Sequence, residues 1–206
     1  MPLTTLRLHG HGRVEVELIV NFLEDLRYAY ASLFVFFDIL PEREPGSYLA
    51  ETFLFLRRFA PEPDRLMDRQ MGVKELELYI PSSERLIMKA VRLSSPGVWE
   101  FLGALNPLEV IRKSLNDLHE RRKDREYREA AERERLELEN ALLESEVLSQ
   151  RIKIAKELGA TDRELALLMN KFVFEPLKAL RRHQIDGLVD NAHIEDDPGN
   201  DDVHFG

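Results

Sequence analysis

The chain has 206 residues, of which 33% are charged and 44% hydrophobic, and its 38 acidic and 29 basic residues give a formal net charge of −9. This composition suits one compact domain with an extension and excludes a wholly disordered chain. The lack of Cys excludes disulfides, thiolate metal sites and cysteine nucleophiles, and it fits a reducing cytoplasm. The acidic balance argues against a large nucleic-acid footprint.

The N-terminal part predicts a small α+β body over residues 1–103. Residues 3–9 alternate weakly and predict a strand, which is followed by a turn at residues 9–12. Apolar residues at helical spacing predict a helix over residues 16–40. The most apolar part of that helix is shorter than the roughly 20 residues that span a bilayer, so we expect a buried helix and no transmembrane segment.

The second half of this body is more ambiguous. Residues 48–59 favour a helix, with a strand as the alternative. Alternation over residues 76–80 and the apolar run 85–93 predict two strands that pair as a hairpin. A further helix is expected from Val98 to a break at Asn106-Pro107. The sequence therefore predicts a small sheet with packed helices.

A long helix over residues 104–158 is predicted next, because residues 108–158 contain neither Pro nor Gly. Its first stripe, Leu108, Ile111, Leu115 and Leu118, should dock on the body. We expect an anchor at the junction between the body and this helix, formed by Trp99, Phe101 and Leu102. Residues 119–135 are mostly charged and nearly balanced in sign.

Residues 136–158 have apolar side chains on two opposite helix faces, so one neighbour cannot cover both. One face suits the chain's own C-terminal helices, and the other suits a second chain. A heptad pattern with one polar core position resembles a parallel dimer seam. The predicted oligomer interface is Leu136, Asn140, Leu143, Val147 and Ile154. The alternative is an ordinary intramolecular helical hairpin.

The C-terminal part predicts short helices over residues 159–189. Gly159 suits a helix end, and residues 161–164 form a capping box that starts the next helix. Glu175-Pro176 should open a last helix. Residues 190–206 carry six acidic and no basic residues, which predicts a disordered acidic tail.

Motifs of known chemistry are missing from the sequence. It has no phosphate-binding glycine loop and no nucleophile elbow. His9 and His11 provide only two metal ligands, whereas zinc sites need three or four. We therefore predict no catalytic, cofactor-binding or metal-binding residues.

These patterns favour a non-catalytic, cytoplasmic scaffold, adaptor or assembly subunit. It would form homo-oligomers through the long helix and bind other proteins. One alternative is a nucleic-acid-associated accessory protein that uses the basic side of residues 121–135, although acidic residues nearly cancel that charge. Another alternative is a regulatory module whose body senses a ligand or peptide.

Overall fold

The computed structural model describes residues 2–10, 15–39, 72–92, 96–123, 146–157 and 159–195. The elements are, in chain order, β1 (Leu3–Gly10), α1 (Val16–Ile39), α4 (Val73–Leu76), η1 (Glu77–Tyr79), η2 (Ser82–Glu84), β2 (Ile87–Arg92), β3 (Gly97–Ala104), α5 (Leu105–Lys123), α7 (Glu146–Glu157), α8 (Asp162–Met169), η3 (Asn170–Phe174), α9 (Glu175–Ile185) and β4 (Asn191–Glu195). The predictions for residues 48–59 and for a continuous helix across 124–145 lie outside the described residues.

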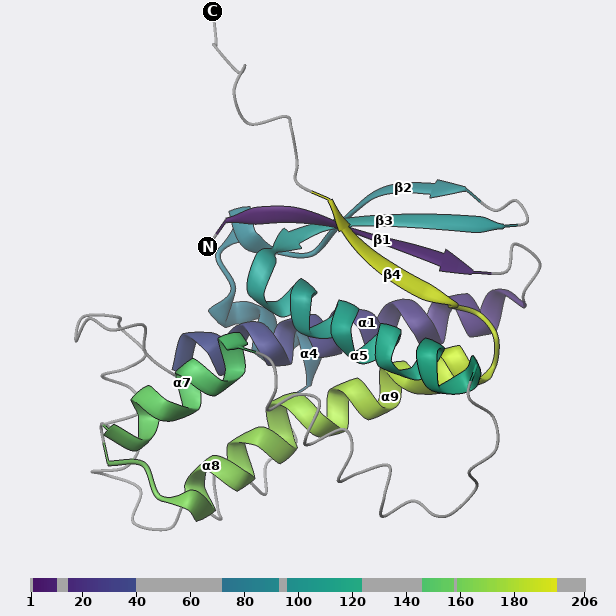
Figure 1. Ribbon diagram of the computed structural model, residues 1–206. Helices are drawn as coiled ribbons and strands as arrows, with labels where there is room; N and C mark the ends of the chain where they lie inside the picture. Colours follow the sequence, from purple (N-terminus) through teal and green to yellow (C-terminus); the bar gives the residue numbers. More distant parts are fainter. Residues whose placement is uncertain are drawn as a thin grey trace, which may run out of the picture.

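The strands form one antiparallel sheet in the order β2-β3-β1-β4. Helical connections separate β1 from β2 and β3 from β4, which gives the β-α-β-β-α-β order of the ferredoxin-like topology. Because such crossovers are almost always right-handed, both helical connections fall on the same face of the sheet. Figure 1 shows this arrangement, with the helices on one side of the strands and the other side open. The predicted α+β fold class is confirmed.

The core lies between the sheet and the helices. Inward residues of the two central strands include Leu6, Leu8, Trp99 and Phe101, all at most 5% exposed. They face α1, whose residues 29–37 are buried without interruption. Burying a large apolar side chain contributes roughly 1.5–3 kcal/mol, so this layer dominates stability.

The apolar run of α1 is a buried helix, as its length predicted. Contacts with α9, η3 and α5 surround it, so apolar side chains are needed on nearly every side. None of the described helices is long and apolar enough to cross a membrane. Three residues of the predicted stripe of α5, Leu108, Ile111 and Leu115, are fully buried, and the side chain of the fourth, Leu118, lies outside those described.

The C-terminal helices begin as predicted. Gly159 has a φ of 88°, which ends the preceding helix, and Thr161 accepts a hydrogen bond from the backbone of Glu164 in a capping box. Pro176 lies in the first turn of α9. However, α8 and α9 are not separate short helices, because the π-helical turn η3 joins them without a gap.

The prediction of a helix from Val98 was wrong, because residues 97–104 form the central strand β3. Apart from Glu100 this run has no charged residue, and so short an apolar segment does not by its periodicity separate a buried helix from a strand. In the structure its side chains alternate between the two faces of the sheet, as in a strand. Trp99 and Phe101 point into the core, whereas Glu100 pairs with Arg7 on the open face.

The predicted strand at residues 76–80 was also wrong. These residues form the end of α4 and the turn η1. Leu76 and Ile80 are four positions apart and buried, whereas Leu78 between them is 80% exposed. That is helical spacing rather than strand alternation. The run at 85–93 does contain a strand, β2, but it pairs with β3.

The predicted tail and the boundary at residue 103 need correction too. Residues 191–195, within the segment 190–206, form β4 and pair with β1 along Thr5–His9. The C-terminal helices pack on α1. The predicted body of residues 1–103 therefore shares one core with the C-terminal part of the chain. Residues 196–206 lie outside the described residues.

Candidate functional site

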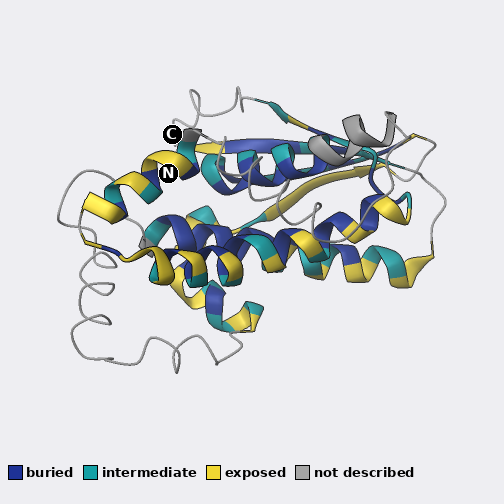
Figure 2. Ribbon diagram, turned by 60° about the horizontal axis from the view of Figure 1, so that its bottom comes forward, coloured by how far each residue is buried: buried dark blue, intermediate teal, exposed yellow. Residues whose placement is uncertain are grey.

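All six residues of the edge strand β2 are exposed. Three of them are large and apolar: Ile87, Met88 and Val91 are 49%, 42% and 45% exposed. Figure 2 shows β2 as a yellow ribbon, in contrast to the dark blue of the buried helix faces. Among the described residues, no strand pairs with the outer side of β2. The backbone donors and acceptors of an edge strand are a template for strand pairing, so β2 combines such a template with apolar surface.

Contacts to α1 hold the segment before β2 in place. The Arg27 guanidinium binds the Glu77 carboxylate, and this hydrogen bond lowers the pKa of Glu77. Tyr30 donates its hydroxyl proton to the carbonyl of Glu84 at 2.5 Å and accepts from the backbone N–H of Ala104 at 2.8 Å. Burial raises the pKa of Tyr30 to about 12. The segment that leads into β2 is thus fixed to α1 by polar contacts at Glu77 and Glu84.

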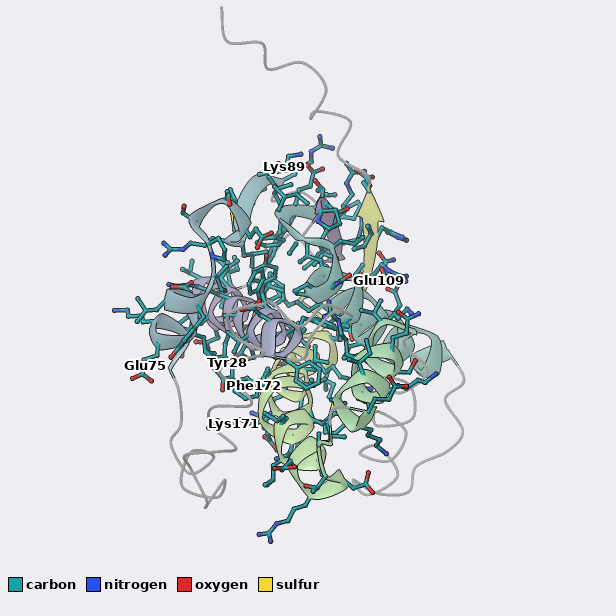
Figure 3. The ribbon with its side chains drawn as sticks, turned by 90° about the vertical axis from the view of Figure 1, so that its left-hand side faces the viewer. Tyr28, Glu75, Lys89, Glu109, Lys171 and Phe172 are labelled. Carbon is teal, nitrogen blue, oxygen red and sulfur yellow. The ribbon has the colours of Figure 1, made fainter. Side chains whose placement is uncertain are left out.

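A β-bulge interrupts the pairing of β2 between Met88 and Ala90. Lys89 lies in this bulge, and its Nζ donates to the hydroxyl of Thr5 at 3.3 Å. Figure 3 shows Lys89 on the sheet side of the molecule, away from the helices. Lysines and bulges commonly protect sheet edges from pairing. Here the lysine reaches back across β3 toward β1 and does not cover the edge.

The open face of the sheet carries an ion network at its centre. Arg7 donates to the Glu100 carboxylate at 2.8 Å and also pairs with Glu195. Next to this network, the rings of His9 and His193 meet edge to face with centroids 5.6 Å apart. The central outward positions are therefore occupied by partnered charges.

The opposite edge, at β4, is closed by a side chain. The amide of Asn116 in α5 donates to the carbonyl of Ala192 and accepts from its N–H, both at 2.9 Å. This amide takes the place that another strand would occupy. Nearby, Gln184 donates to the carbonyls of Leu115 and Asp190 and ties α9 to α5 and to the start of β4. The edge at β4 is thus capped by the side chain of Asn116.

The predicted oligomer interface is only partly described. Leu136, Asn140 and Leu143 lie outside the described residues. Val147 and Ile154 are half-buried on α7. The fully covered side of α7 is a different one, formed by Leu148, Arg151 and Ala155. The guanidinium of Arg151 lies 5.9 Å from the ring centroid of Phe37 in α1.

The predicted anchor residues all lie on β3. Trp99 and Phe101 are 5% and 2% exposed, and the Trp99 ring is 4.9 Å from that of Phe22 in α1. Leu102 is half-buried and pairs with Thr5 and Ile87 on the open face. The three residues therefore point to both faces of the sheet.

Histidines occupy two further positions of note. His193 on β4 comes next to His9, whereas His11 lies outside the described residues. His183 in α9 is 6% exposed, and its Nε2 lies 2.8 Å from Oδ2 of Asp25 in α1. Among the described residues, no group of three or more His, Asp or Glu side chains is placed to hold a metal ion.

No protein-family model, curated protein or solved structure matches this chain. The exposed edge at β2 was not predicted as a candidate site, because the sequence pattern indicated a hairpin partner for that strand at residues 76–80. One local feature of the sequence did indicate a binding surface there, because residues 85–92 contain three basic residues and no acidic one.

Proposed function

We propose that this chain is a non-catalytic assembly or adaptor subunit that binds another protein at β2. The observation that carries the proposal is the exposure of all six β2 residues, three of them large and apolar, at an edge of the sheet. A folded protein rarely leaves apolar surface at an edge strand unless a partner covers it. A reducing, cytoplasmic setting belongs to this proposal, since a chain without Cys forms no disulfides.

The nucleic-acid alternative has less support. Four-stranded sheets that bind single-stranded RNA stack bases on aromatic side chains of the central strands. In this sheet the central outward positions hold Arg7 and Glu100, which bind each other. The basic side chains of residues 121–135 lie outside those described. The peptide-sensing alternative agrees better with β2, because a peptide is one kind of partner that an edge strand accepts.

A photo-cross-linking experiment tests the proposal. A benzophenone amino acid replaces Met88 on β2 or, as a control, the exposed Ala166 on α8. Irradiation in cells should give a defined protein adduct from position 88 and none from position 166. Adducts of equal yield from both positions, or from neither, would contradict the proposal.

Self-association through residues 136–158 is a separate part of the proposal. It is supported by the two apolar faces of that segment, of which α7 buries the one containing Leu148. Light scattering should show an oligomer that Leu143→Glu or Ile154→Glu converts to a monomer of about 24 kDa. If the wild-type protein is a monomer at micromolar concentration, self-association through residues 136–158 is disproved, but the proposed role of β2 is not affected.

A further inference from the structure

The backbone of β2 presents specific groups to an incoming strand. The side chain of Asn116 forms hydrogen bonds with both the N–H and the C=O of Ala192. These two groups therefore point away from Leu8, the residue of β1 that lies opposite Ala192. Bonded and non-bonded pairs alternate along an antiparallel ladder. The N–H and C=O of Leu8 must therefore form hydrogen bonds with the backbone of Trp99 on β3. The backbone of Trp99 then faces β1, so the N–H and C=O of Val91, the residue of β2 opposite Trp99, point to the free edge.

The same reasoning applies two residues along the sheet. Leu6 bonds to Phe101, which leaves the backbone groups of Met88 at the free edge. Because Leu6 and Phe101 are buried on the helix side, Met88 in the same row points to that side too. Val91, opposite the buried Trp99, does likewise. An added strand would meet two backbone positions whose side chains are apolar and face the helix side.

The charged residues of this edge strand are all basic. Arg85, Lys89 and Arg92 are exposed, and no acidic residue occurs between residues 85 and 92. Antiparallel pairing of β2 with a second copy would bring these basic residues close to those of the copy, and like charges across strands are destabilising. A strand with acidic residues would gain from the same positions.

We propose that β2 binds an extended acidic peptide segment of a partner protein by antiparallel strand addition. Apolar residues of the segment pack beside Met88 and Val91 on the helix side, and the alternating acidic residues lie on the open side, where Arg92 is exposed. Main-chain hydrogen bonds supply the affinity, and the alternate side chains supply the specificity. This inference rests on the proposed function and names the chemistry of the partner.

Binding of a model peptide tests the inference. The probe is an amidated octapeptide of alternating valine and glutamate, and the comparison peptide alternates valine and lysine. The full chain should bind the glutamate peptide at least tenfold more tightly than the lysine peptide. Arg92→Glu should weaken this binding at least tenfold, whereas Lys153→Glu, at an exposed position on α7, should leave it unchanged.

A proline variant tests the strand geometry. The N–H of Val91 points to the free edge, so Val91→Pro removes no hydrogen bond to β3 but blocks an added strand. This variant should lose peptide binding while keeping the wild-type circular dichroism spectrum. Equal binding of both peptides, or unchanged binding to Val91→Pro or Arg92→Glu, would overturn the inference.

Other occupants give different results. A chain that dimerises alone and becomes monomeric on Val91→Pro would show that a second copy pairs with β2, which overturns the inference. A chain ending at Glu195 that binds the glutamate peptide tenfold more tightly would show that residues 196–206 occupy the edge, which also overturns a separate partner. Adducts at position 88 without selective peptide binding would reject the acidic chemistry and retain the proposed function.

Discussion

Gly10 ends β1 at a point where another part of the backbone comes very close. A Cβ placed on this residue would lie 1.9 Å from the carbonyl oxygen of Leu188, in the turn that leads to β4. Backbone cannot swing aside as a flexible side chain does. Gly10→Ala should therefore lower the free energy of unfolding by about 1–3 kcal/mol, as overpacking does in other cores. Urea unfolding measures this loss.

Gly72 provides the matched control for that substitution. A Cβ on Gly72 would meet no atom within 4 Å, and its φ of −70° suits alanine. Gly72→Ala should change the unfolding free energy by less than about 1 kcal/mol. Equal losses in the two variants would show that the approach of Leu188 to Gly10 does not limit stability.

Tyr30 couples the stability of the fold to alkaline pH. Its pKa is about 12, raised mainly by burial, and it lies above the usual value near 10. The protonated hydroxyl therefore stabilises the fold fully below pH 10, and this contribution is lost as the pH rises through 12. Wild-type protein should lose about 2–3 kcal/mol of unfolding free energy across this window, following the size of the shift.

The variant Tyr30→Phe isolates this effect. Removing the hydroxyl leaves the carbonyl of Glu84 and the N–H of Ala104 without this partner, which should cost about 1–3 kcal/mol at neutral pH. The difference between wild type and variant should then shrink between pH 10 and 12. Chemical denaturation at pH 8 and at pH 11.5 measures it, and a constant difference would disprove the coupling.

At the scale of elements, Asn116 protects the edge of β4. Asn116→Ala should expose the N–H and C=O of Ala192 and cost about 1–3 kcal/mol, because two partly buried hydrogen bonds are lost. Hydrogen exchange of the Ala192 amide should speed up, while exchange in β3 stays slow. Asn170→Ala, at an exposed helical position, serves as the control. Unchanged exchange at Ala192 would argue against this cap.

Local signals in the sequence predicted some elements well. The helix at 16–40 and the cap at Thr161 were found because periodicity and capping act within a few residues. The strand β3 was mistaken for a helix because an apolar run does not reveal its period. The alternation of Ala192 and Ile194 with polar residues could have revealed β4, but the acidic residues around it suggested a tail.

The exposed edge of β2 was harder to predict for a different reason. Its identity as an edge depends on which strands pair, and pairing links residues far apart in the chain. Arg7, Glu100 and Glu195 meet on the open face although they come from β1, β3 and β4. No local pattern encodes such a meeting. The candidate site therefore follows from topology, whereas the basic character of β2 could be read from the sequence.

At the scale of the whole molecule, the two ends of the described chain meet in one sheet. β1 is the first described element and β4 is the last. The two strands pair along Thr5–His9 of β1. This pairing closes the fold, because β4 covers the side of β1 that β3 leaves free. The C-terminal segment therefore contains both a structural strand and the acidic residues that follow it.

Two truncations separate these parts. A chain that ends at Val189 lacks β4, so it loses the ladder to β1 and leaves Asn116 and Gln184 without their backbone partners at Ala192 and Asp190. It should unfold at a clearly lower urea concentration or fail to fold. A chain that ends at Glu195 keeps every described contact and should unfold at the wild-type midpoint. If both truncations unfold alike, β4 does not close the fold, and the segment 190–206 behaves as one dispensable tail.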